Sequence, residues 1–136
     1  MNKPKKYNIV DTYFYDYHSL QISIETSKII LKSLEMELDC EKESNNHGSV
    51  YLLNKKIISR KNLIDNLTEQ LNTMEKIIDK FPNQLRGAEY NIFKESVLYN
   101  KSAHDVASEL GYSEQYVYKI RSRILTNFKY YLEATR

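Results

Sequence analysis

The C-terminal third of the chain contains a short segment rich in side chains that can hydrogen-bond to nucleotides. Between Gln115 and Arg123 the sequence reads QYVYKIRSR, with polar residues set between apolar ones at helical spacing. Glutamine can bind an adenine edge and lysine a guanine edge, whereas Arg121 and Arg123 suit phosphates or a guanine edge. The candidate contact residues are Gln115, Tyr118, Lys119, Arg121, Ser122 and Arg123. The predicted chemistry is contact with a DNA duplex.

Positive charge is concentrated in the same region. The whole chain of 136 residues has a net charge of only +2. After Glu114, by contrast, cations outnumber anions five to one, as a phosphate-binding face requires. The five cations are Lys119, Arg121, Arg123, Lys129 and Arg136, and the anion is Glu133. An ordinary solvated helix face could carry the same charges. The secondary structure that positions these residues must therefore distinguish a DNA-binding face from a solvated one.

Two helices separated by a reversal at Gly111 are predicted to hold this segment. Ser102 and Ser113 are candidate N-caps, and Ala107 is the small residue that a steep helix crossing needs. Glycine suits the left-handed turn that such a reversal favours. The residues expected to face inward are Val106, Ala107, Leu110, Tyr112, Val117, Ile120, Ile124 and Phe128. The pattern favours a helix-turn-helix, whose second helix enters the major groove, over a merely structural helical turn. A helix over 86–99, with Tyr90, Phe93 and Val97 on one face, is expected to precede it.

The N-terminal half contains two long heptad seams. The first runs from Tyr13 to Leu38 with a polar gap at Ser27, and the second from Leu53 to Phe81 with a gap at Arg60. The polar stretch CEKESNNHGSV lies between them, and Pro82 ends the second. We therefore expect an antiparallel helical hairpin whose polar gaps lie in neighbouring layers. These gaps either fix the register, with Glu35 within reach of Arg60, or are two tolerated defects.

The first helix has a second set of apolar residues opposite its seam. This outer stripe, spaced by sevens, consists of Tyr15, Ile22, Ile29 and Met36. A two-stranded hairpin leaves it in water, and a contiguous exposed apolar strip usually marks a contact surface. We expect it to pack on another subunit, giving a homo-oligomer, or on the C-terminal domain.

Several other classes of protein are not expected. Cys40 is the only cysteine, so no intrachain disulfide can form, and a cytoplasmic location fits. His18, His47 and His104 have no metal-ligand spacing with it, and no glycine-rich phosphate loop or nucleophile motif occurs. No apolar run is long enough to span a membrane. We therefore predict no metal, no cofactor, no membrane association and no enzymatic activity.

The C-terminal ~55 residues resemble region 4 of bacterial sigma factors. The resemblance is carried by SAHDVASELGYSEQYVYKIRSRIL, from Ser102 to Leu125. With the charged helical half before it, the chain resembles phage late-gene transcriptional activators of the RinA/ArpU type. That likeness implies a regulator in the cytoplasm of a bacterial host that binds promoter DNA to activate late or packaging genes, with host RNA polymerase as a further partner. It also supports Gln115, Tyr118, Lys119, Ser122 and Arg123 as the DNA-facing set.

The predicted fold is therefore all-α, with a long antiparallel helical hairpin (coiled coil) over 1–82 and a helix-turn-helix domain over 83–136. Two other functions stay open. A phage small terminase subunit also combines a helix-turn-helix with helical oligomerisation parts, although there the DNA-binding motif usually comes first. A coiled-coil interaction protein acting on a host factor is the other.

Overall fold

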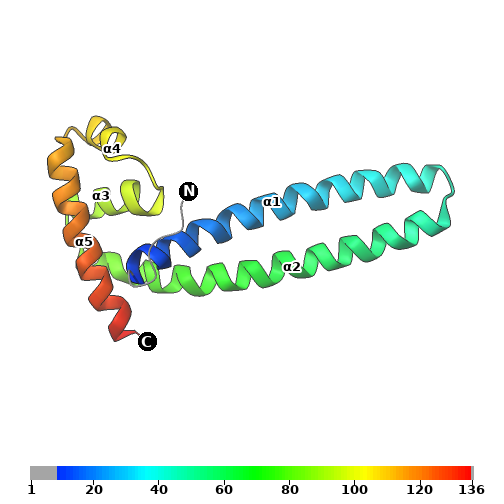
Figure 1. Cartoon of the computed structure of the whole chain (residues 1–136), viewed down its shortest axis with the longest axis horizontal. Coiled ribbons are helices and arrows are strands. Elements are labelled where there is room, and N and C mark those ends of the chain that lie inside the picture. Colours follow the sequence, from blue (N-terminus) through cyan, green and yellow to red (C-terminus); the bar gives the residue numbers. More distant parts are fainter. Residues whose placement is uncertain (1–8, 136) are drawn as a thin grey trace. The chain divides into compact units, whose positions relative to one another are not determined.

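The computed structural model describes residues 9–135, without the side chains of residues 83 and 84. This part of the chain is helical and contains no strand, so the predicted all-α class is confirmed. The elements in chain order are α1 (Ile9–Glu43), α2 (His47–Lys80), η1 (Phe81–Gln84), α3 (Ala88–Ile92), η2 (Phe93–Leu98), α4 (Ala103–Leu110) and α5 (Glu114–Ala134) (Figure 1). Within the described range, no helix combines the length and the apolar character that crossing a membrane requires.

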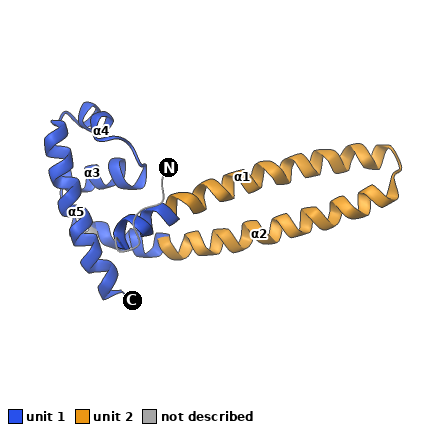
Figure 2. Ribbon diagram, viewed as in Figure 1, with its two compact units in different colours: residues 1–16, 75–136 blue, residues 17–74 orange. Residues whose placement is uncertain are grey.

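The chain divides into two compact units (Figure 2). The hairpin unit is Tyr17–Met74, and the C-terminal unit combines Met1–Asp16 with Glu75–Arg136. The expected boundary at residue 82 differs from this division, because the ends of both long helices group with the C-terminal segment. The heptad pattern continues along each long helix, so it does not show where the helix stops packing in the hairpin unit and starts packing in the C-terminal unit.

In the hairpin unit, α1 and α2 run antiparallel and are joined by a loop of only three residues, 44–46. The predicted loop was longer and included Gly48, which instead lies in the first turn of α2. Asn45 makes the reversal with φ 55°, a left-handed conformation that asparagine tolerates better than most residues. Its backbone N–H donates to the carbonyl of Lys42 at 3.2 Å.

The hairpin seam follows the predicted heptads and includes the polar layer. Leu38, Leu53 and Ile57 form a buried cluster near the loop. Further along, the Arg60 guanidinium donates to Ser27 Oγ at 3.5 Å, and Ser27 is buried. The two polar gaps therefore meet, and Arg60 contacts Ser27 rather than Glu35.

The core of the C-terminal unit is a cluster of aromatic rings. The centroid of the Phe128 ring lies 4.8 Å from that of Phe14 and 5.0 Å from that of Phe81. Phe81 in turn lies 5.2 Å from Phe93, and Phe81, Phe93 and Phe128 are all 0% exposed. Tyr131 packs on Phe81 and donates its hydroxyl to the carbonyl of Ile77 at 3.0 Å. Side chains of α1, η1, η2 and α5 thus meet in one apolar centre, which holds the C-terminal half of α5.

The predicted helix over 86–99 is present in two parts, α3 and the π-helix η2. A π-helix has more residues per turn than an α-helix, so neighbouring pairs can face the same side. Accordingly Ile92 with Phe93, and Ser96 with Val97, are buried. Tyr90, which was expected on the core face, is 44% exposed, because Ile92 and Phe93 occupy the buried side of the helix instead.

Candidate nucleic-acid interface

The short helix α4 begins and ends as its sequence predicts. The Ser102 hydroxyl accepts a hydrogen bond from the backbone N–H of Asp105 at 3.1 Å, which caps the helix. At the other end Gly111 has φ 77° and ψ 29°, in the left-handed region. The N–H groups of Gly111 and Tyr112 both donate to the carbonyl of Ala107, at 2.9 and 3.0 Å. The glycine therefore allows the chain to leave α4 and reverse at once.

Only three residues, 111–113, lie between the end of α4 and the start of α5. Ser113 caps it by accepting from the N–H of Tyr116 at 3.1 Å. His104 Nδ1 also lies 3.1 Å from Glu114 Oε1, so the first turns of α4 and α5 are linked. The two helices pack together, with Val106 and Ala107 of α4 and Val117 of α5 buried. One side of α5 is thereby held against the unit.

Five of the six predicted contact residues lie on the exposed side of α5. Gln115, Lys119 and Ser122 project opposite the buried positions 117, 120 and 124. Tyr118 and Arg123 flank this line and are also exposed. These five residues define the outward face of α5.

Arg121 does not join that face. It is half-buried in an open groove of about 590 Å³ beside the start of α1. The groove is lined by Val10, Asp11, Tyr118, Arg121, Ser122, Leu125, Thr126 and Lys129. Thr126 and Lys129 continue the exposed side of α5 and were not among the predicted contacts. The spacing of seven from Ser122 to Lys129 is the sequence signal that could have added Lys129.

The cations of α5 differ in their surroundings from Lys101, which precedes α4. Among the described residues, Lys119, Arg123 and Lys129 are exposed and have no carboxylate within ion-pair distance. Lys101 Nζ instead lies 2.8 Å from Glu109 Oε2 and 2.7 Å from Glu95 Oε2. These hydrogen bonds raise the pKa of Lys101 above its usual range. Lys101 is therefore engaged within the fold, whereas the α5 cations can contact an external anion. Arg136, also predicted to contribute, lies outside the described residues.

Within the described range, no group of three or more His, Cys, Asp or Glu side chains is placed to hold a metal ion. No family model matches the chain, and no curated protein or solved structure does.

Proposed function

We propose that the protein is a sequence-specific DNA-binding transcriptional regulator that reads the major groove with α5. One observation carries the proposal: the outward face of α5 bears cations without ion-pair partners, immediately after a three-residue turn that begins at Gly111. The resemblance of residues 102–125 to sigma-factor region 4 and to RinA/ArpU-type activators supports an activator of late or packaging genes in a phage or mobile element.

The residue types on this face suit base recognition. A major groove about 12 Å wide admits an α-helix, and in helix-turn-helix proteins the N-terminal part of the second helix contacts base edges. In this proposal Gln115 binds an adenine edge and Lys119 a guanine edge. Lys129, three turns further along, is suited to a phosphate, which contributes affinity without sequence information.

A second function is favoured by a different observation. Ile22, Ile29 and Met36 of the hairpin unit are strongly exposed, as in a protein that works by binding another protein. A coiled-coil protein acting on a host factor would need this surface and no DNA contact. The two functions differ in what the α5 cations do, so they can be separated by DNA titration.

The experiment selects a preferred duplex from a random library with the full-length protein and then titrates it by fluorescence anisotropy. Lys119→Ala together with Arg123→Ala should weaken binding by ~1–3 kcal/mol for each lost base-edge contact. Lys129→Ala should instead weaken binding to selected and scrambled duplexes alike and reduce the salt slope by about 0.9.

The matched control removes two exposed cations from the hairpin unit, Lys32→Ala with Lys61→Ala. It changes the net charge equally and should leave specific affinity unchanged. Selection that enriches no sequence, or equal losses in the control and in the α5 variant, would reject α5 as the reading helix.

A further inference from the structure

Between Tyr17 and Met36, the charged side chains of α1 are confined to one side of the helix. Between Tyr17 and Met36, the charged residues are Glu25, Lys28, Lys32 and Glu35. Their steps of 3, 4 and 3 place them in one stripe along the helix. The exposed remainder of α1 in this range is uncharged, although it faces water.

On that uncharged side, large and small residues alternate. Ile22, Ile29 and Met36 are 63%, 70% and 62% exposed. Small residues alternate with them along the same side, at Thr26 and Ser33 between them and at Ser19 and Cys40 beyond either end. Steps of 3 and 4 make this a second seam on the outside of α1, where small positions allow another helix to approach closely. We call these seven residues the uncharged face. Tyr15, the fourth predicted member of the outer stripe, is half-buried and belongs to the C-terminal unit.

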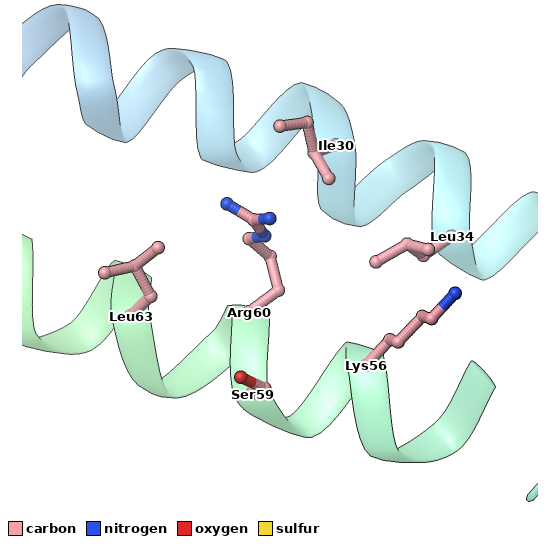
Figure 3. Close-up of a pocket in the computed structure, with 6 residues that line it drawn as sticks. All are labelled: Ile30, Leu34, Lys56, Ser59, Arg60 and Leu63. Atoms are coloured by element: carbon pink, nitrogen blue, oxygen red, sulfur yellow. The ribbon is translucent and has the colours of Figure 1, made fainter. Parts of the chain in front are cut away.

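A groove between the two helices extends the uncharged face toward α2. It has a volume of about 280 Å³ and is lined by Ile30, Leu34, Lys56, Ser59, Arg60 and Leu63. Figure 3 shows Ile30 and Leu34 projecting from α1 toward α2, with Leu63 projecting from α2. The Arg60 guanidinium donates to Ser27, which leaves Lys56 as the other cation of the groove. Apolar side chains thus supply half of the residues that line the groove.

We propose that the uncharged face binds a second copy of this chain, with α1 antiparallel to its counterpart about a two-fold axis near Ile29. Ile22 and Met36 each lie seven residues from Ile29, and the small positions 26 and 33 lie on either side of it. The pattern is thus nearly the same in both chain directions, as a two-fold interface between identical surfaces requires.

The exposed apolar area of the uncharged face is large enough for an interface with a second copy of the chain. The three large residues of the uncharged face and Leu63 expose on the order of 500 Å² per chain, the size of the largest patches on monomeric proteins, which are often functional. Two copies together would bury about 1,000 Å² of this surface, the lower limit for a specific interface. The dimer is independent of the proposed DNA contact, so either inference can fail alone.

Light scattering of the full-length protein without DNA gives the first test. The wild type at tens of micromolar should have twice the chain mass, and Ile22→Glu with Ile29→Glu should halve it while circular dichroism keeps its helical signal. The control Asn54→Glu with Asn72→Glu adds the same charge at exposed α2 positions and should remain dimeric. A monomeric wild type, or a glutamate variant that stays folded and dimeric, would overturn the interface.

Cysteine cross-linking tests the axis and does not depend on the glutamate variant folding. In a Cys40→Ser background, Ile29→Cys should oxidise to a linked dimer, because a residue on the axis meets its own copy within disulfide range. Ile22→Cys and Met36→Cys should each stay unlinked alone and link when mixed. Self-linking of all three variants would overturn the antiparallel arrangement, and no linking in any combination would overturn the dimer.

Discussion

The C-terminal unit and the hairpin unit bury their apolar residues in different ways. In the C-terminal unit, α1, η1, η2 and α5 contribute rings to one centre, and Phe81, Phe93 and Phe128 are completely buried. In the hairpin unit, two helices share a seam one layer wide, and large apolar residues remain exposed on the outer sides. A core enclosed on all sides can fix the geometry of a recognition surface, whereas a two-helix seam leaves a surface open for a partner.

The largest expected effect comes from the centre of the C-terminal unit. Phe128→Ala would remove a ring packed against Phe14, Phe81 and Phe93 and leave a cavity, which typically costs ~3–5 kcal/mol. Leu38→Ala in the hairpin seam should cost only about 2 kcal/mol, because the site borders solvent and can relax. Urea denaturation followed by circular dichroism measures both. Equal losses would contradict the contrast between an enclosed core and an open seam.

A smaller effect is expected at Gly111, the first residue of the turn between α4 and α5. Gly111→Val should cost about 2 kcal/mol, since a β-branched residue would have to adopt φ 77°. A Cβ atom at Gly111 meets nothing within 4 Å, so the cost would come from the backbone alone. Thermal denaturation measures it. Gly48→Ala is the control and should stabilise the protein by about 0.5–1 kcal/mol, because Gly48 is helical. Unchanged stability of Gly111→Val would contradict the need for glycine at this turn.

Local chemistry explains which features the sequence predicts well. Ser102, Ser113 and Gly111 act on the backbone within four residues of themselves, so their roles follow from type and spacing alone. The exposed side of α5 follows in the same way from the period of its buried residues. The half-burial of Tyr15 and Arg121 does not follow from spacing, because it comes from packing between segments distant in the chain.

Features that depend on long-range packing were missed for a physical reason. Phe81 continues the heptads of α2, yet its ring packs on Phe93 and Phe128, because the helix pairing gives way to the ring cluster there. No residue type in the sequence marks the π-helix η2, in which Phe93, Ser96 and Val97 are buried. Asn45 makes the left-handed turn that a sequence reader assigns to the nearby glycine.

The polar layer of the hairpin should have a modest effect on stability. Arg60→Leu with Ser27→Ala replaces a long 3.5 Å hydrogen bond by apolar packing. Such replacements of buried polar groups are often neutral or stabilising, so we expect a gain of about 1 kcal/mol in urea denaturation. Arg60→Ala alone serves as the comparison, since it removes packing without replacing it. A clear loss in the double variant would mean that the hydrogen bond itself stabilises the seam.

The smallest expected effect is a change in melting temperature when an ion pair is removed from one unit or from the other. Lys101 bridges Glu95 and Glu109, whereas Lys28 lies 3.7 Å from Glu25 with both side chains mostly in water. Lys101→Met should lower the melting temperature slightly, and Lys28→Met should leave it unchanged, because exposed pairs contribute little. The folded chain raises the pKa of Lys101, chiefly through the hydrogen bond to Glu109 and then that to Glu95.

The sign of that pKa shift fixes the pH dependence of the effect. A raised folded pKa means that the contribution of Lys101 is fully present below the unfolded value of about 10.4 and is lost as the pH rises through the folded value. The difference in melting temperature between wild type and Lys101→Met should therefore be constant from about pH 7 to 9 and shrink at higher pH. A difference that varies between pH 7 and 9, or one that Lys28→Met reproduces, would show that the bridge has no special role in the C-terminal unit.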